Sequence, residues 1–222
     1  VENKARGEGR CGELLDRWLL DRPMLQAFRG VREELSLRTA AVLAHHPGAR
    51  ILVFNAGAGA LISELAAMLE RFPTPGGATG VLTIVDQSRA ALERAESVLA
   101  SSRVEHHILQ ENLIQLATGR ARHPFADQDI VLVHGLLEYL PDRLAVSLLK
   151  AARDALDLGG TVIAGALAPS GDSVLLDRLL GWPTIRRGRD GIATLFEAAR
   201  LTPQIERPLP ALWTVTATLG LE

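Results

Sequence analysis

The sequence has almost no cysteine, few aromatic residues and no excess of charge of one sign. Cys11 is its only cysteine, which excludes an internal disulfide and a cysteine-based metal cluster. A single thiol fits a reducing compartment, so we expect a cytoplasmic protein. The formal net charge of −2 gives no basis for binding nucleic acid or an anionic membrane surface.

Long apolar runs are also missing. No run approaches the roughly 20 residues that a membrane-spanning helix needs, and residues 1–4 (Val-Glu-Asn-Lys) do not resemble the start of a signal peptide. The first residue is not Met, which suggests a trimmed chain or a domain of a longer protein. Aromatic residues make up 4% of the chain and hydrophobic residues 47%, so a sizeable core must be aliphatic.

Short apolar runs alternate with segments of helical periodicity, which predicts an α/β domain. The runs are continuous, as expected of strands buried on both faces of a parallel sheet. Ser88 is a good N-cap, and Gly159-Gly160 is expected to end the helix that starts at Pro141. The predicted strands are 51–54, 81–85, 104–109, 130–133 and 161–164, and the helices between them are 60–71, 88–101 and 141–156.

The two ends of the chain depart from this alternation. Pro23 separates two predicted helices, 12–20 and 24–45, and their apolar residues are expected to pack on the sheet or at the pocket mouth: Leu14, Leu15, Trp18, Leu25 and Phe28. At the other end, helices at 172–180 and 189–200 precede strands at 204–207 and 213–219. We therefore predict an N-terminal helical segment (1–48) and a Rossmann-like, doubly wound domain (49–222), mostly parallel with an antiparallel C-terminal edge.

The turn after the first strand is rich in glycine. Its sequence is Asn-Ala-Gly-Ala-Gly-Ala at residues 55–60, and Gly57 and Gly59 would let the backbone approach a ligand closely. Asn55 occupies the usual place of a first glycine, and Asn tolerates a left-handed conformation. By itself the motif also fits a tight turn without a ligand.

An acidic residue, Asp86, ends the second strand. A carboxylate at this point can accept both ribose hydroxyls of an adenosine-containing cofactor, although it can also cap the next helix. The glycine turn and Asp86 together predict such a cofactor, without distinguishing NAD from S-adenosylmethionine.

Residues 129–142 resemble the fourth strand and following loop of class I methyltransferases, and 157–163 resemble their turn into strand five without its usual proline. More narrowly, segments 10–18, 133–143 and 177–182 resemble the bacterial family of extracellular-factor 3-hydroxypalmitic acid methyl ester biosynthesis proteins. Members of that family often carry a regulatory domain ahead of this region, which would suit an excised fragment.

The resemblance implies methyl transfer from S-adenosylmethionine to a carboxylate of a small or acyl hydroxy acid, with S-adenosylhomocysteine as product. Asn112 stands where the superfamily commonly contacts adenine. The residues expected to bind the cofactor are Asn55, Ala56, Gly57, Gly59, Asp86, Gln87, Asn112 and His134.

A carboxylate acceptor is already ionised, so the enzyme need only hold it in line with the methyl group. The candidate catalytic residues are His134, Glu138 and Tyr139. If the acceptor were a hydroxyl, His134 or Glu138 would be its base. His134 is equally explained as a packing residue, and Glu138 as a helix cap. We expect a rate that is flat above pH 6 and a pocket walled by Leu136, Leu137 and Trp182.

Arg186, Arg187 and Arg189 suit either a bound carboxylate or a solvated face, the second being the more common explanation. The His45-His46 and His106-His107 pairs lack metal-ligand spacing, so no metal site is predicted.

Two alternatives remain at this point. Val53 stands where many methyltransferases carry an acid, and Leu167-Ala168 follows strand five where a polar or aromatic residue is expected. With Asn55, these departures also fit a degenerate module that kept the fold for binding, regulation or scaffolding. An NAD-dependent oxidoreductase is the other alternative, although its fingerprint would ask for glycine at position 55.

Overall fold

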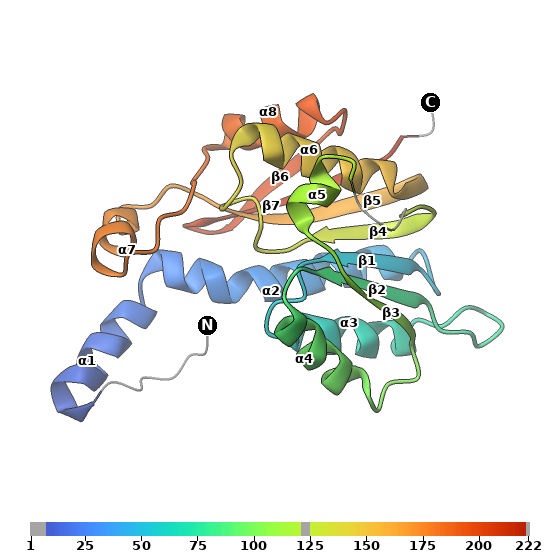
Figure 1. The fold of residues 1–222 in the computed structure, drawn as a ribbon, viewed down its shortest axis with the longest axis horizontal. Helices are drawn as coiled ribbons and strands as arrows, with labels where there is room; N and C mark the ends of the chain where they lie inside the picture. The colour runs from blue at the N-terminus through green and yellow to red at the C-terminus, as the bar shows by residue number, and fades with distance from the viewer. Residues whose placement is uncertain (1–7, 121–124, 221–222) are drawn as a thin grey trace.

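The computed structural model describes residues 8–120 and 125–220 (Figure 1). The helices are α1 (Gly9–Leu20), α2 (Pro23–Leu43), α3 (Ala60–Arg71), α4 (Arg89–Leu99), α5 (Leu113–Ala117), α6 (Asp142–Asp154), α7 (Ser173–Leu179) and α8 (Arg189–Ala198). The strands are β1 (Arg50–Phe54), β2 (Val81–Asp86), β3 (Glu105–Gln110), β4 (Gln128–Val133), β5 (Leu156–Leu167), β6 (Gln204–Leu209) and β7 (Leu212–Thr218).

Within the described residues, the seven strands form one sheet in the order β3-β2-β1-β4-β5-β7-β6. The strands from β3 to β5 are parallel to their neighbours, whereas β7 is antiparallel to β5 and β6. The predicted Rossmann-like sheet with an antiparallel C-terminal edge is confirmed. The strand order reverses between β1 and β4, which is the switch point where open α/β sheets bind ligands.

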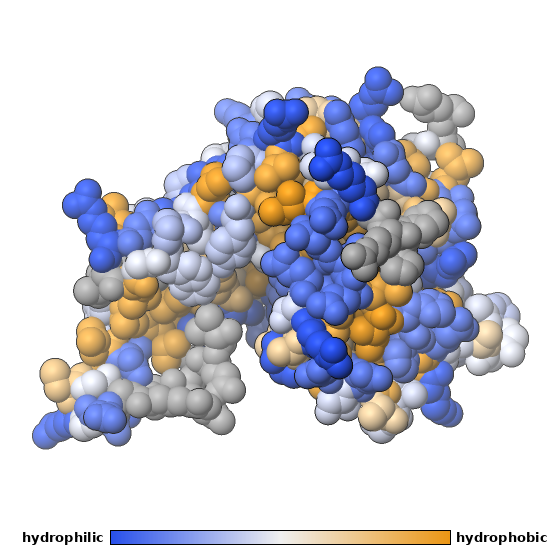
Figure 2. Space-filling model, in the orientation of Figure 1, coloured by the Kyte–Doolittle hydropathy of each residue, from blue (hydrophilic) through white to orange (hydrophobic). Residues whose placement is uncertain are grey.

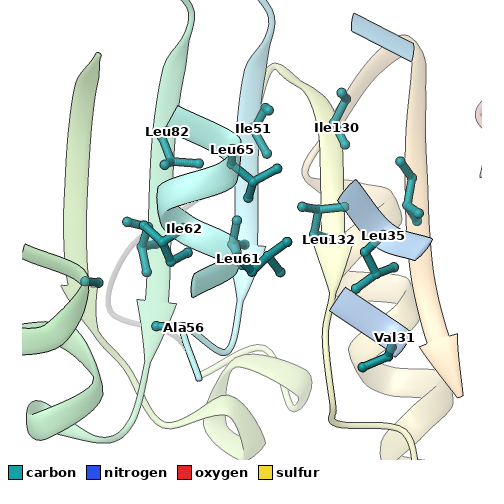
Figure 3. Packing of buried hydrophobic residues seen from close by; sticks show 14 of the residues in the cluster. Val31, Leu35, Ile51, Ala56, Leu61, Ile62, Leu65, Leu82, Ile130 and Leu132 are labelled. Atoms are coloured by element: carbon teal, nitrogen blue, oxygen red, sulfur yellow. The ribbon is translucent and has the colours of Figure 1, made fainter. Parts of the chain in front are cut away.

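Different helices cover the two faces of the sheet. Ile51 and Val53 of β1 belong to the buried cluster that includes α2, α3 and α4, while Leu52 and Phe54 belong to the cluster of α5, α6 and α8. Successive side chains of a strand point to opposite faces, so a sheet covered on both sides needs an unbroken apolar run. Figure 3 shows the first cluster, with side chains of α2 and α3 packed on β1, β2 and β4.

Helix α2 lies close against the sheet because two contact points are glycine. A Cβ on Gly165 of β5 would stand 2.2 Å from Val31 Cγ2, and a Cβ on Gly30 of α2 would stand 2.4 Å from Leu209 Cδ1. Neither distance is compatible with van der Waals packing, so a larger residue at either point would force the Val31 or Leu209 side chain to move.

The structure corrects the predicted boundary between α6 and β5. The helix predicted to reach Leu156 ends at Asp154, and Leu156 already belongs to β5. Between Leu156 and Thr161 the chain leaves its pairing with β4. Gly159 N–H donates to the Leu219 carbonyl (3.2 Å), and Leu219 N–H donates to the Gly160 carbonyl (2.8 Å). The glycines mark a bulge within a strand rather than the end of a helix.

Helix α1 also departs from the prediction. Leu14, Leu15 and Trp18 are 58%, 51% and 44% exposed, and α1 has no buried residue. They do not pack on the sheet, whereas Leu25 is buried and Phe28 packs against the core as expected. Figure 1 shows that α1 projects beyond the sheet, and of its apolar residues the partly buried Leu19 packs against the core. No helix in residues 8–120 and 125–220 combines the length and apolarity that a membrane span requires.

Candidate cofactor and acceptor site

The loops that follow the parallel strands meet at the carboxyl edge of the sheet. Loop 55–59 follows β1, residues 87–88 follow β2, residues 111–112 follow β3 and loop 134–141 follows β4. Ligands of open α/β sheets bind in the crevice that such loops form. In Figure 2 the molecular surface is hollowed between the lobe that carries α1 and α7 and the body of the protein.

Loop 55–59 has the conformation predicted for it. Asn55, Gly57 and Gly59 have positive φ angles of 78°, 57° and 87°, so Asn takes the left-handed conformation at the first of the three positions. The Asn55 side-chain amide donates a hydrogen bond to the His134 carbonyl (2.8 Å). This bond joins the loop after β1 to the loop after β4.

Asp86 holds the glycine loop in place through its side-chain carboxylate. One carboxylate oxygen accepts from the Ala56 backbone N–H (2.9 Å), and the other accepts from the Ser88 backbone N–H (2.8 Å). Ser88 is the N-cap of α4, as predicted, and its hydroxyl accepts from Ala91 N–H. Asp86 is 3% exposed. Each carboxylate oxygen can accept a second hydrogen bond, so a ribose hydroxyl remains a fitting partner.

A polar pocket of about 460 Å³ opens beside Asp86 at the ends of β2 and β3. Asn112 and Gln87 line it, as expected of cofactor contacts, and Asn112 also accepts hydrogen bonds from Ile114 and Gln115 N–H as the N-cap of α5. Sequence reasoning missed α5, which is a single short turn, and three further lining residues: Gln110, Glu111 and Gln115. The polar run after β3 was the available signal.

His134 lies against the glycine loop. A Cβ placed on Gly57 would stand 3.3 Å from His134 Cε1, so a side chain there would require the ring to shift by a few tenths of an ångström. His134 Nδ1 is buried and has no hydrogen-bond partner in the described part of the chain. Burial lowers the pKa of His134, and the Asn55 backbone opposes this only in part. The ring is therefore neutral at pH 7.

Glu138 is a buried carboxyl in the same loop. It is 4% exposed, and its Oε2 has no hydrogen-bond partner among the described residues. A Cβ on Gly135 would stand 3.9 Å from Glu138 Oε1 and 3.4 Å from Asn55 Nδ2, so the carboxyl lies near the junction of the two loops. Burial raises the pKa of Glu138 to about 7, and its own backbone N–H and Arg187 offset the effect in part.

The arginines near residue 187 serve the fold. Arg187 is 8% exposed and donates to the Leu137 carbonyl (2.6 Å), the Leu140 carbonyl (2.7 Å) and the Asp142 carboxylate (2.7 Å). Arg186 pairs with the Asp177 carboxylate. Arg187 is therefore neither free to bind a ligand carboxylate nor part of a solvated face, whereas Arg186 keeps a buried Nε that has no partner among the described residues.

Aromatic residues from three segments form a wall beside loop 134–141. Trp182 Nε1 donates to the Tyr139 hydroxyl (3.1 Å), and the Trp182 ring stacks on Phe28 at 4.4 Å between centroids. Asp172 holds the start of α2 in place by accepting from Met24 N–H (3.0 Å). We call Phe28, Tyr139 and Trp182 the aromatic wall.

Of the two leucines predicted to wall the pocket, one does not do so. Leu137 is 0% exposed and belongs to the core beneath α6, so it does not line a pocket, whereas Leu136 is only partly buried. Of the histidine pairs, His45-His46 lies at an exposed turn and His106-His107 in the edge strand β3. No group of three His, Cys, Asp or Glu residues in the described ranges is arranged to hold a metal ion.

Solved structures share this fold at low sequence identity. A possible exported protein from Bordetella parapertussis matches with a TM-score of 0.71 and 19% identity, over 93% of this chain and 73% of that chain. Magnesium protoporphyrin IX methyltransferase (ChlM) from Synechocystis PCC 6803 with bound SAH matches with a TM-score of 0.62 and 15% identity, over 85% and 83%. The N-methyltransferase NodS from Bradyrhizobium japonicum WM9 matches with 0.58 and 16%, over 91% and 99%.

These similarities establish that the chain has the Rossmann-like fold found in methyltransferases. No protein-family model matches the sequence, and no curated protein is significantly similar to it.

Proposed function

We propose that the protein is an S-adenosylmethionine-dependent methyltransferase. The observation that carries the proposal is the arrangement at the ends of β1, β2 and β3. A glycine loop follows β1, a buried carboxylate at the end of β2 supports it, and a polar pocket lies at the ends of β2 and β3. ChlM, which shares the fold, has been solved with SAH and with SAM. S-adenosylmethionine would supply an activated methyl group at this edge.

The residues present fit that cofactor. Asp86 is assigned to the ribose hydroxyls, because each of its oxygens keeps one free lone pair. Gln87 and Asn112 line the pocket where adenine would lie. The backbone of Asn55, Ala56, Gly57 and Gly59 would follow the methionine portion, since a side chain at Gly57 would meet His134.

The acceptor proposed is a carboxylate of a small or acyl acid, giving a methyl ester. His134 and Tyr139 would bind its head group, because His134 offers an unpartnered ring nitrogen and Tyr139 lies on the exposed side of the same loop. The aromatic wall would hold the apolar remainder, each buried methylene contributing about 0.8 kcal/mol. The line of attack is set by orientation, and no side chain needs to remove a proton.

A protic acceptor is the second candidate, favoured by His134. Its neutral ring with a free Nδ1 beside the cofactor loop has the properties of a general base. The cytoplasmic location and the N-terminal segment (1–48) as a separate unit stay part of the proposal.

The test combines binding and turnover. Calorimetry with S-adenosylmethionine, S-adenosylhomocysteine and NAD should show binding of the first two and none of NAD; tight NAD binding would exclude the proposal. Labelled S-adenosylmethionine at saturation, with a panel of acyl acids, should give a rate that is flat above pH 6. A rate rising between pH 6 and 8 would favour a protic acceptor, and tight binding without turnover would favour a degenerate module.

A further inference from the structure

The glycine loop has no acid of its own. Val53, in the strand that leads into it, is 0% exposed and packs in the core. Asp86 uses both of its oxygens to bind backbone amides. Glu138 differs, because its Oε2 is buried and has no partner in the described residues. A buried acceptor atom without a donor is costly unless a ligand supplies the donor.

The carboxyl of Glu138 lies near Gly135, at the junction of loop 134–141 with the glycine loop. Its neighbour across Gly135 is the Asn55 side chain of the glycine loop. Tyr139, the next residue, instead turns toward the aromatic wall and is 46% exposed. Adjacent residues of this loop therefore face different parts of the site.

We propose that Glu138 binds the α-ammonium group of S-adenosylmethionine, providing from loop 134–141 the negative charge that the glycine loop lacks. This inference rests on the proposed function. Of the two cationic groups of the cofactor, only the ammonium carries N–H donors, which is what an unpartnered carboxyl oxygen requires. The head group of the acceptor is left to His134 and Tyr139.

The surrounding charges leave Glu138 available. Arg187 has hydrogen bonds to the Leu137 and Leu140 carbonyls and to Asp142, and it makes none to Glu138 Oε2. His134 is neutral, and burial together with the Glu138 charge raises the pKa of Tyr139. Asp86 bonds to Ala56 on the other part of the glycine loop. The charge of Arg187 acts on Glu138, but its hydrogen bonds go to other groups, so Glu138 Oε2 could still accept from the ammonium group of the ligand.

The experiment separates the amino-acid part of the cofactor from its adenosine part. Calorimetry with S-adenosylmethionine, S-adenosylhomocysteine and 5′-methylthioadenosine, which has no ammonium group, is performed on the wild type and on Glu138→Gln. The variant should bind the first two at least tenfold more weakly and 5′-methylthioadenosine unchanged. Glu197→Gln, which removes the same charge from the exposed face of α8, should leave all three affinities unchanged.

A second measurement uses the wild type alone. Its affinity for S-adenosylhomocysteine should increase between pH 5.5 and 7.5, because the ammonium pairs with ionised Glu138, while its affinity for 5′-methylthioadenosine stays constant. Equal affinities of wild type and Glu138→Gln for S-adenosylhomocysteine would overturn the inference, as would an equal loss for all three ligands. Failure of the wild type to bind either full cofactor form would overturn the proposed function as well.

Discussion

The two halves of the carboxyl edge differ in how their buried polar groups are satisfied. On the β1–β2 side, Asp86 accepts two backbone hydrogen bonds and Asn112 caps α5. On the β4 side, His134 Nδ1 and Glu138 Oε2 are buried and have no partner in residues 8–120 and 125–220. Burial lowers the pKa of His134 and raises that of Glu138. The polar groups of the first half are paired within the chain, whereas these two atoms of the second half have no partner among the described residues.

This difference indicates that the β1–β2 half stabilises the fold and that the β4 half serves function. Polar groups that are mutually satisfied hold a loop in one conformation and stabilise the fold. Buried groups with perturbed pKa values reduce stability, and they concentrate at functional sites. Three changes should break or sharpen the contrast between the halves.

The largest effect is expected from Asp86→Ala. The substitution removes two hydrogen bonds to a charged group and leaves the buried Ala56 N–H without its acceptor. The free energy of unfolding should fall by about 3–6 kcal/mol. Affinity for S-adenosylhomocysteine should fall by at least tenfold. Denaturant unfolding and calorimetry measure the two effects.

Asp86→Asn is the matched control, because an amide oxygen can still accept one of the two bonds. It should lose less stability than the alanine variant. If Asp86→Ala unfolds like the wild type, the β1–β2 half is not held by this carboxylate. An unchanged affinity would contradict the ribose assignment.

The Glu138 carboxylate should lower the free energy of unfolding, whereas the Asp86 carboxylate raises it, and the effect of Glu138 should depend on pH. Its pKa is about 7 in the folded protein and 4.5 ordinarily, so the folded state keeps a proton that the unfolded state loses between these values. Stability from this group is complete below pH 4.5, decreases as the pH rises to about 7 and is then constant. The loss amounts to about 3 kcal/mol.

Unfolding in denaturant at pH 5 to 8 without ligand should show this decrease for the wild type, and a smaller one for Glu138→Gln. The difference between the proteins isolates Glu138, because His134 titrates in both. If the free energy of unfolding varied with pH in the same way for wild type and Glu138→Gln, Glu138 would have an ordinary pKa. The β4 half would then not be destabilised by a buried carboxylate.

Removal of residues 1–20 should have the smallest effect on stability. Helix α1 has no fully buried residue, although its partly buried Leu19 packs against the core, so the free energy of unfolding should change by about 1 kcal/mol or less. Affinity for S-adenosylhomocysteine should be unchanged, since the cofactor half has no contribution from α1, while turnover of the acceptor decreases. Leu35→Ala, in the buried part of α2, is the contrasting variant and should cost about 2–5 kcal/mol. Equal loss of cofactor binding and turnover would show that α1 is only structural.

The elements predicted most accurately are those whose cause is local. Ser88 caps α4 because its hydroxyl reaches an amide three residues away, and Asn55 adopts positive φ because its own side chain tolerates it. The boundary of β5 was predicted wrongly, since the glycines at 159–160 are held by Leu219 from the far end of the chain. No local pattern contains that partner.

The sequence by itself determined the parallel sheet, because unbroken apolar strands must be covered on both faces, and it determined the glycine loop and its acid at the ends of β1 and β2. Tertiary structure alone decided what the polar groups do there. Arg187 is held in place because it donates to carbonyls 47 and 50 residues away in the sequence. Glu138 is buried because the tertiary fold places its loop against other parts of the chain. Hydrogen-bond satisfaction and burial depend on partners distant in sequence, so a residue's local pattern specifies its conformation but not its charge environment.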